Sequence, residues 1–214
     1  MLLPTPNAPP ISGVVVGSDG GRIQATVTAH GLTPPSVSAT AETGPDGSFV
    51  LGGLPDGNYQ LCVEDKGGTY LDPCAWSETQ VIVAAKGSRP VSGFRLVMAL
   101  GVKLEVRVND AGRVLDPVAP PANRPRTELV VAAVTPRNIV LPVRFAGRTG
   151  AVRSHRIAVS SGARMFVGVL SFGANVNDPQ GRPIEAGRIT SLPITIPAGQ
   201  NPPPVDLTVT GARP

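Results

Sequence analysis

Glycine and proline occur along the whole chain, and their frequency constrains the fold more than any other sequence feature. The 214 residues include 25 glycines and 24 prolines. Helices rarely tolerate these residues at such a frequency, whereas sheets joined by tight turns do. The glycines follow no three-residue period, which excludes a collagen helix. Hydrophobic residues make up 41% of the chain and charged residues 16%, so an all-β protein with a buried core is expected.

Several segments alternate apolar and polar residues with the period of two that is typical of half-buried strands. They run over residues 23–29, 102–108 and 206–210. Residues 92–100 end instead in a nearly continuous apolar run, which predicts a strand covered on both faces. Turn signals such as Pro45-Asp46-Gly47 recur at short intervals. No segment has the spacing of an amphipathic helix, so little helix is expected.

Strand number and charge both divide the chain into two domains. Residues 11–100 contain about seven candidate strands, the usual complement of one small sandwich, and residues 101–214 contain about as many again. Residues 1–100 carry 5 basic and 8 acidic groups, whereas residues 101–214 carry 14 basic and 7 acidic groups. We therefore predict two tandem antiparallel β-sandwiches of the Ig-like or prealbumin-like kind, over residues 11–100 and 101–214. A proline-rich arm, residues 1–10, precedes them, and the proline-dense residues 117–125 are interpreted as a loop inside the basic second domain.

The sequence contains no recognisable membrane span or leader. The longest unbroken aliphatic run, residues 129–134, is far shorter than the roughly 20 residues that cross a bilayer. The start, Met1-Leu2-Leu3-Pro4, has neither the basic nor the apolar region of a signal peptide. The chain is therefore either a cytosolic protein or a mature chain written without its leader, and cysteine usage favours the second alternative.

The two cysteines, Cys62 and Cys74, lie twelve positions apart. Around Cys62 the apolar set is Tyr59, Leu61 and Val63, so Cys62 points away from the core and is placed to pair with a cysteine in a loop. Closing so short a loop stabilises a fold by roughly 3 kcal/mol. The alternative is a pair of buried reduced thiols. A bridge implies an oxidising compartment, and we therefore expect an extracellular or cell-surface protein.

Three motifs in the first domain match those of a known family. They are Gly13-Val14-Val15, Asp46-Gly47-Ser48-Phe49 and Leu54-Pro55-Asp56-Gly57-Asn58-Tyr59. With these motifs, residues 11–100 resemble the carboxypeptidase regulatory-like domain, a prealbumin-like sandwich, although residues 30–35 and the cysteine loop depart from its pattern. Residues 101–214 resemble, more loosely, the domain that follows this module in large secreted proteins of some soil bacteria. The resemblance implies a structural or interaction module, with similar sandwiches in adhesins, and implies no catalytic activity.

The chain lacks the signatures of enzymes built on related sandwiches. Neither His30 nor His155 is followed by glutamate at the third position, as a metallocarboxypeptidase zinc site requires. The two histidines are too far apart in the sequence for the iron site of an intradiol dioxygenase. His155 alternates with Ile157 and Val159, which favours a semi-buried histidine, and no Gly-x-Ser-x-Gly elbow occurs. We expect no catalytic residues, no metal site and no cofactor.

Aspartates in turns are interpreted as turn-forming residues rather than calcium ligands. Each of Asp19, Asp46, Asp110 and Asp178 lies in a turn without the dense acidic spacing of a calcium loop. Two of these turns, residues 108–113 and 176–182, share the opening Val-Asn-Asp and a following arginine. This echo indicates either a duplicated domain or hairpin turns that arose independently.

Two features are candidate interaction sites. The cysteine loop, residues 67–76, holds Tyr70 and the only tryptophan, Trp76, which could stack on a sugar ring or fill a pocket of a partner; alternatively, Trp76 caps the open end of the sandwich. The second feature is a series of arginines with no acidic residue between Glu128 and Asp178: Arg137, Arg144, Arg148, Arg153, Arg156 and Arg164. It predicts a basic face, which is either simply solvated or binds a polyanion. Nucleic acid is disfavoured because no nucleic-acid motif accompanies the series and aromatic residues are scarce.

Taken together, these patterns indicate a non-enzymatic secreted structural or adhesive protein. The net charge of −3 in residues 1–100 and +7 in residues 101–214 would attract successive copies head to tail, and such a contact grows into a fibre when it does not close. The expected partners are further copies of the chain or another extracellular protein. The alternative is a carbohydrate- or polyanion-binding module of a larger secreted protein, using Tyr70 and Trp76 or the arginine series.

Overall fold

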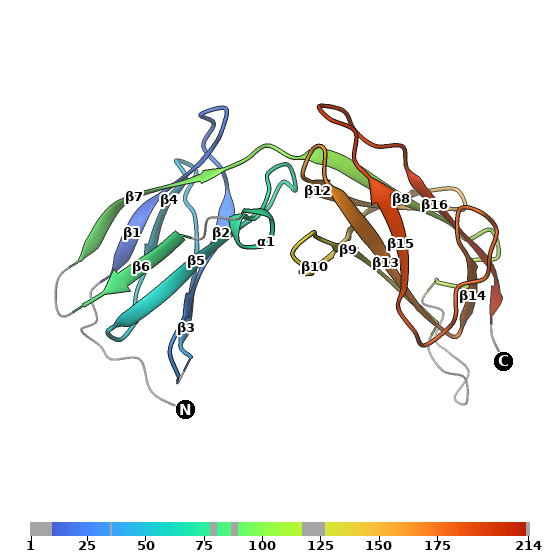
Figure 1. Ribbon diagram of the computed structural model, residues 1–214, viewed down its shortest axis with the longest axis horizontal. Helices are drawn as coiled ribbons and strands as arrows, with labels where there is room; N and C mark the ends of the chain where they lie inside the picture. The colour runs from blue at the N-terminus through green and yellow to red at the C-terminus, as the bar shows by residue number, and fades with distance from the viewer. Residues whose placement is uncertain (1–9, 35, 78–80, 87–89, 117–126, 213–214) are drawn as a thin grey trace. The chain divides into compact units, whose positions relative to one another are not determined.

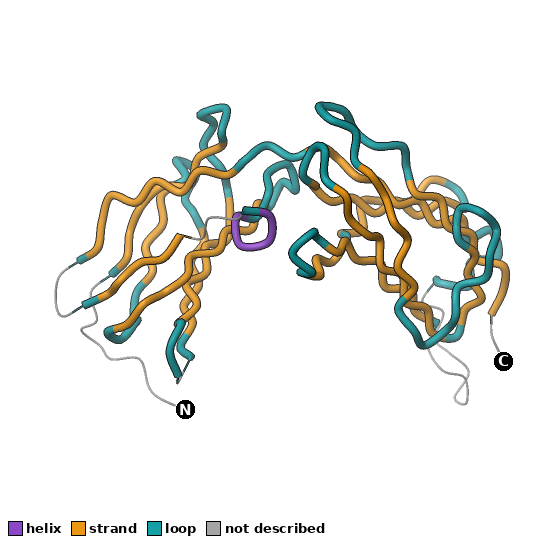
Figure 2. The backbone as a smooth tube through the Cα atoms, in the orientation of Figure 1, coloured by secondary structure: helices purple, strands orange, loops and turns teal. Residues whose placement is uncertain are grey.

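A computed structural model describes residues 10–34, 36–77, 81–86, 90–116 and 127–212. The chain divides into two compact units, Met1–Gly101 and Val102–Pro214, and each is described by itself (Figure 1). The proline-rich arm before Pro10 and the proline-dense segment 117–125 lie outside the described residues. Strands make up most of the rest, with one turn of helix (Figure 2). Within these ranges, no helix is long and apolar enough to cross a membrane.

The first unit packs a three-stranded sheet, in the order β4-β1-β7, against a four-stranded sheet, β3-β2-β5-β6. The helix α1 follows β5 and precedes β6. The elements are β1 (Ile11–Gly17), β2 (Ala25–Gly31), β3 (Ser38–Glu42), β4 (Ser48–Leu51), β5 (Gly57–Asp65), α1 (Pro73–Trp76), β6 (Val81–Ala85) and β7 (Val91–Met98).

The core of the first unit forms where the alternating apolar residues of the two sheets meet. Val27 in β2, Leu61 in β5 and Phe49 in β4 are buried, together with the neighbouring inward positions of each strand. Burying one such side chain stabilises a fold by roughly 1.5–3 kcal/mol. The alternation predicted for residues 23–29 is confirmed, because Ile23, Val27 and the alanines between and after them are all buried.

The prediction that residues 92–100 form a strand covered on both faces is wrong. In β7, Leu96 and Met98 are buried, but Val97 between them is 48% exposed and Leu100 is 54% exposed. The reason lies in the place of β7 in the sheet. It pairs with β1 at the edge of a three-stranded sheet whose outer side is open to solvent.

The second unit packs the sheet β10-β9-β13-β15 against the sheet β11-β12-β8-β16-β14. As predicted, Leu104, Val106 and Val108 of β8 and Leu207 and Val209 of β16 are buried. The strands are β8 (Val102–Asn109), β9 (Glu128–Val134), β10 (Val140–Pro142), β11 (Arg144–Thr149), β12 (Val152–Val159), β13 (Arg164–Phe172), β14 (Ala174–Asn177), β15 (Thr190–Thr195) and β16 (Val205–Ala212).

The structure thus has the predicted class, an all-β chain of two tandem sandwiches, with one difference in strand pairing. Pairs are antiparallel except β1 with β7 and β8 with β16, which are parallel. In both units the parallel pair joins the first strand to the last. Parallel strands need a long connection rather than a hairpin, and here the rest of the unit supplies it.

Candidate functional site

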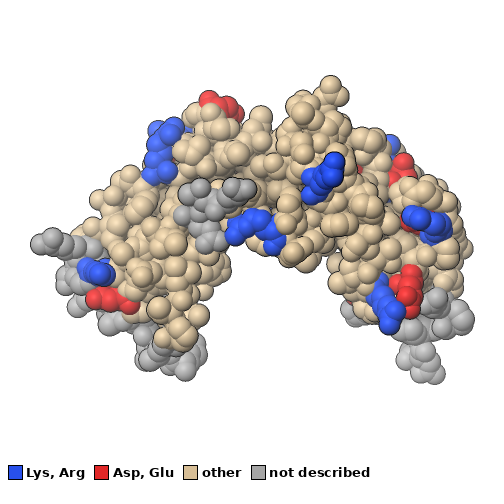
Figure 3. Space-filling model, in the orientation of Figure 1, with Lys and Arg blue, Asp and Glu red and all other residues tan. Residues whose placement is uncertain are grey.

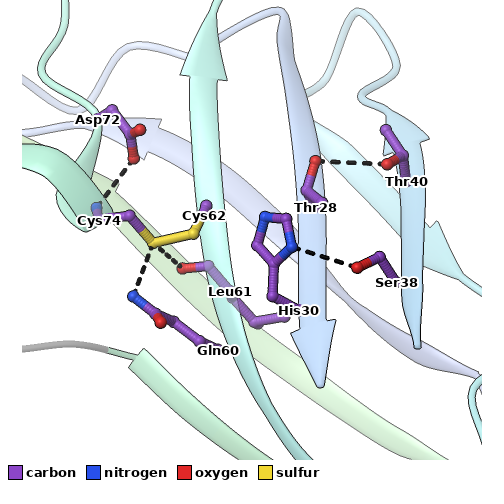
Figure 4. The surroundings of a disulfide bond; sticks show 9 residues. All are labelled: Thr28, His30, Ser38, Thr40, Gln60, Leu61, Cys62, Asp72 and Cys74. Atoms are coloured by element: carbon purple, nitrogen blue, oxygen red, sulfur yellow. Dashed lines mark hydrogen bonds between the residues drawn. A yellow bond between two sulfur atoms is a disulfide. The ribbon is translucent and has the colours of Figure 1, made fainter. Parts of the chain in front are cut away.

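A disulfide bond between Cys62 and Cys74 ties the outer face of β5 to α1 (Figure 4). Cys62 lies between the buried residues Leu61 and Val63, as the alternation predicts. The Cα atoms of the two cysteines are 5.3 Å apart. Gln60 Nε2 donates a hydrogen bond to Cys74 Sγ at 3.1 Å. The loop between the cysteines is therefore held against the sheet at both of its ends.

Asp72 sets the start of α1 and so the position of Cys74. Its carboxylate accepts a hydrogen bond from the Cys74 N–H at 2.9 Å, which is the usual arrangement of an N-cap. Pro73 occupies the first position of the helix, where an N–H would have no partner within the helix. Burial raises the pKa of Asp72, although the hydrogen bond from Cys74 lowers it in part.

The two aromatic residues of the cysteine loop are both partly buried. The Tyr70 hydroxyl lies 3.0 and 3.2 Å from the two carboxylate oxygens of Asp19 and donates to them. The Tyr70 ring lies so close to Gly17 that a Cβ added there would come within 2.6 Å of it. Trp76 is the last residue of α1 and is also partly buried. Tyr70 thus packs against the end of β1, and a ligand contact by Tyr70 and Trp76 stays a prediction.

The six arginines predicted to form one basic face lie on different surfaces. Strand alternation turns two of them outward and two inward on one sheet, and the other two belong to the opposite sheet. The outward pair is Arg144 and Arg156, the inward pair is Arg148 and Arg153, and the opposite sheet carries Arg164 on β13 and Arg137 in the turn before β10. The prediction of a single basic face is therefore corrected. Figure 3 shows basic side chains dispersed over the face in view rather than gathered.

The inward pair shares one acidic side chain, Asp116. Arg148 Nη1 forms an ion pair with Asp116 Oδ1, and Arg153 Nη1 lies 3.8 Å from the same oxygen. The Arg153 guanidinium also lies 5.5 Å from the centre of the Phe145 ring. Phe145 in turn meets the His155 ring edge to face, with 5.6 Å between the ring centres. These contacts hold β11 and β12 together at the border of the core.

His155 is half-buried, as its alternation predicts. It lines a small pocket of about 130 Å³ together with Arg153, Glu128 and three neighbouring residues of the same unit. Burial lowers the pKa of His155, a hydrogen bond to the backbone of Val143 opposes this effect, and the Arg153 charge lowers the pKa further. The imidazole is therefore held in its neutral form at neutral pH.

The outer face of the sheet β10-β9-β13-β15 is apolar and exposed. Val140 is 61% exposed, and Phe166 and Phe172 are each 44% exposed. Among the outward residues paired along its strands, the charged ones are at the two ends: Arg164 at the start of β13 and Glu128 beside Phe172. We call this surface the apolar face. Exposed apolar patches of such extent on soluble proteins commonly mark interaction sites.

Cross-strand pairing arranges the residues of the apolar face in rows across the sheet. The first row is Val140, Val134, Phe166 and Pro193; the second is Pro142, Ala132, Gly168 and Ser191; the third is Val130 and Leu170; the last is Glu128 and Phe172. Ile189, which is 67% exposed, lies over the second row, with its Cγ2 at 3.5 Å from a Cβ placed on Gly168. The strand residues of the middle row are small, and the Ile189 side chain covers part of this row beside Gly168.

The outer face of the other sheet in the same unit is charged. Glu105 on β8 lies 2.9 Å from Arg107 of the same strand and 3.2 Å from Arg156 of β12. Partial burial raises the pKa of Glu105, but hydrogen bonds from Arg107 and Arg156 outweigh this and lower it overall. One sandwich thus has one outer face of the ordinary polar kind and one that is apolar.

The first unit also has a polar outer face, on the sheet β3-β2-β5-β6. There, Thr28 pairs with Thr40 and His30 with Ser38 through cross-strand side-chain contacts of 3.4 and 3.2 Å (Figure 4). Polar side chains of neighbouring strands on this face thus pair with one another. The apolar face of the second unit has no comparable polar pattern.

Sequence reasoning missed the apolar face, although the sequence carries a signal for it. Residues 129–134 and 165–170 are continuous apolar runs with no alternation, a pattern typical of strands covered on both faces. The structure assigns these runs to β9 and β13, where the core covers one face only. The runs were informative, but only the pairing of β9 with β13 brings their outward residues together.

The described part of the chain contains no group of three or more His, Cys, Asp or Glu side chains that could hold a metal ion. Two side-chain polar atoms in it are buried without a hydrogen-bond partner, Arg148 Nη2 and Ser171 Oγ. They belong to different sheets, on β11 and β13, and form no common site.

No family model matches the chain, and no curated protein matches its sequence. The similarity of residues 11–100 to carboxypeptidase regulatory-like domains therefore stays a prediction.

The solved structures to which the chain is similar include the following three bacterial proteins. The Bacillus anthracis TIE protein shares 12% identity over 95% of this chain and 33% of its own, with a TM-score of 0.37. A streptococcal ancillary pilin shares 14% identity over 98% of this chain and 63% of its own, with a TM-score of 0.43. A minor pilin of Streptococcus agalactiae shares 10% identity over 97% and 98%, with a TM-score of 0.37. The chain thus spans less than two thirds of the first two proteins.

Proposed function

We propose that this chain is a non-enzymatic extracellular interaction protein that docks through the apolar face of its second unit. The apolar face is the observation that carries the proposal. Four strands spaced about 4.8 Å apart, with a rise of about 3.4 Å per residue, give this face an area of roughly 500 Å². Isolated soluble domains rarely leave more than a few hundred Å² of contiguous apolar surface in water.

The extracellular part of the proposal rests on the disulfide bond between Cys62 and Cys74. Disulfide bonds persist in oxidising compartments and are rare in the cytosol. Both cysteines of the chain are used in this bond. The bond holds a surface loop against a sheet and adds no reactive thiol, as is usual for a structural rather than a catalytic disulfide.

The non-enzymatic part of the proposal rests on how the titratable groups are used. His155 packs edge to face against Phe145, which Arg153 also contacts, and His30 is paired with Ser38 on the other unit. Asp116 and Glu105 form ion pairs with arginines. These groups serve the packing and charge balance of each sandwich, and the Ser38 hydroxyl beside His30 belongs to an exposed cross-strand pair on an open sheet face.

The proposal is tested with the full-length chain carrying a small tag and produced in its native cells. We expect the tagged chain outside the cells, oxidised, and in a complex larger than the monomer. Phe166→Asp should release it as a monomer, because a charge cannot be buried unpaired against an apolar partner. The matched control is Val97→Asp on β7, a similarly exposed apolar position in the first unit, which should leave the complex intact. A reduced cytosolic chain, or a complex that survives Phe166→Asp, would contradict the proposal.

A further inference from the structure

We propose that the occupant of the apolar face is the same face of a second copy of this chain, related by a two-fold axis. This inference rests on the proposed function and names its partner. It predicts a closed dimer, because in a two-fold contact the same surface of both copies is buried and none is left to bind a third copy. The charge division of the sequence suggests instead an open head-to-tail assembly.

The face is self-complementary about its centre. Along β13 the outward residues are Arg164, Phe166, Gly168, Leu170 and Phe172, so Gly168 is the midpoint. A two-fold axis that lies in the interface, crosses β13 at right angles and passes over Gly168 reverses this order in the second copy. Phe166 then meets Leu170 of the second copy, and the central row meets itself, with the exposed Ile189 side chain beside Gly168 in each copy.

The same operation brings opposite charges together. Arg164 stands at one end of the face, and Glu128 stands at the other end in the row of Phe172. Reversal of the strand direction sets Arg164 of each copy over Phe172 and beside Glu128 of the other copy. A guanidinium there gains both an ion pair and the face of an aromatic ring. With no further charged residue in the rows between these two ends, the interior of the contact is apolar.

The edges of this sheet favour packing by its face over addition of a further strand. The outer strands are β10 and β15, and each contains a proline, Pro142 and Pro193. Proline has no N–H to donate, so it interrupts the hydrogen bonding that a strand from another chain would need.

The size of the face is consistent with a weak dimer. Two faces of roughly 500 Å² bury about 1,000 Å² in total, which is the lower limit for a specific interface. A second copy presents the reversed charge pattern and the same apolar central row, and both follow from the two-fold axis itself. The expected association is concentration-dependent and persists at high salt, because its interior is apolar.

The inference is tested by sedimentation equilibrium of the purified full-length chain over a wide concentration range. We expect a monomer–dimer equilibrium with no larger species. Phe166→Asp should weaken dimerisation by about tenfold or more, because each dimer would bury two unpaired carboxylates. Val97→Asp, the control in the first unit, should leave the equilibrium unchanged. Circular dichroism and thermal melting check that each variant is folded, which is expected because both positions are exposed.

A charge exchange tests the two-fold geometry itself. Arg164→Glu and Glu128→Arg should each weaken the dimer by about fivefold, because each variant places like charges together twice per dimer. The double variant restores opposite charges and should return the dissociation constant to within about twofold of the original value. A double variant weaker than either single variant would overturn the inference.

The two proposals fail separately. A purified chain that is monomeric at every concentration overturns the two-fold dimer. If Phe166→Asp still disrupts the complex isolated from native cells, the proposed docking function stands with a different partner. If Phe166→Asp has no effect on that complex either, both proposals fail.

Discussion

Three buried aspartates shape the ends of strands in both units. Asp65 ends β5, and Asp110 and Asp178 directly follow β8 and β14. Each accepts hydrogen bonds from backbone N–H groups of the turn that follows, which would otherwise lack partners. The sequence echo of residues 108–113 in residues 176–182 therefore reflects one kind of turn. Both of these turn sequences lie in the second unit, and Asp65 forms the same kind of turn in the first unit. The sequence similarity of the two turns is therefore no sign of a duplicated domain.

Replacing Asp65 by alanine should destabilise the first unit. Asp65 accepts hydrogen bonds from Gly67, Thr69 and Tyr70, at 2.6 to 3.0 Å, and its loss leaves three amides without their partner. We expect the free energy of unfolding to fall by about 2–3 kcal/mol. Urea denaturation followed by circular dichroism measures the change. Asp206→Ala on the exposed face of β16 is the control and should change stability by less than about 0.5 kcal/mol.

His155 should make the second unit less stable as the pH falls. The pKa of His155 in the folded chain is lowered from its ordinary value of 6.5, chiefly by burial. The unfolded chain therefore binds a proton more readily than the folded one. The stability that neutral His155 provides is complete above pH 6.5 and is lost as the pH falls from there through the folded pKa.

The measurement is the melting temperature from pH 7.5 to pH 5, a range of about one unit or more on either side of an unperturbed histidine pKa. His155→Gln should flatten the decline relative to the original chain. The control is His30→Gln, which changes the exposed histidine on β2, and it should keep the slope of the original chain. Equal slopes for the two variants would show that burial of His155 does not govern the effect.

At the scale of elements, the link between β5 and α1 depends on one covalent bond. The helix α1 is four residues long, too short to be stable alone. It is held by its N-cap Asp72, by the disulfide bond and by the packing of Ala75, which is buried. The rest of the loop folds back through the Tyr70–Leu100 bridge near the end of the unit.

Removing the disulfide should destabilise the first unit and leave the second unchanged. For a loop of this length the loss in unfolding free energy is roughly 3 kcal/mol. Differential scanning calorimetry of Cys62→Ala/Cys74→Ala should show a lower transition for the first unit only. A reducing agent should produce the same shift in the original chain and none in the double variant. An unchanged transition in both experiments would mean that the N-cap and core contacts alone hold the loop.

At the scale of the whole molecule, two kinds of association have opposite salt dependence. Head-to-tail attraction between a domain of charge −3 and one of charge +7, as counted from the sequence, is screened over about 10 Å at 0.1 M salt. Contact between apolar faces is not screened and is strengthened by salts such as sulfate.

We expect the purified chain to keep its association state when salt is raised. Light scattering after size exclusion, at low salt, at high sodium chloride and in sulfate, measures this directly. The dimer should persist at high sodium chloride, weakened by no more than about the fivefold that its screened ion pairs supply, and its fraction should be highest in sulfate. Assemblies that grow beyond the dimer at low salt and dissolve at high salt would instead favour the head-to-tail fibre. Arg164→Glu separates the two cases, since it should weaken the face-to-face dimer most at low salt.

How far the sequence predicts the structure can be seen from particular strands. Each of the strands β2, β8 and β16 has one face exposed to solvent, and the alternation of apolar and polar residues alone identifies which residues are buried. The prediction for β7 was wrong because a continuous apolar run occurs both in strands covered on one face and in strands covered on both faces. The prediction of one basic face from the six arginines was wrong for another reason. A count of charges along the chain does not show on which face of which sheet each side chain lies.

The sequence by itself determined the class of fold, the period of the half-buried strands and the outward direction of Cys62, because these depend on local chemistry: turn residues, alternation and spacing. Tertiary structure alone decided which strands are neighbours. Only the pairing of β9 with β13 gathers Val130, Phe166 and Phe172 on one surface, and only the pairing of β12 with β8 and β11 divides the arginines. Such neighbours are far apart in the chain, and their contact depends on long-range packing that no local pattern encodes.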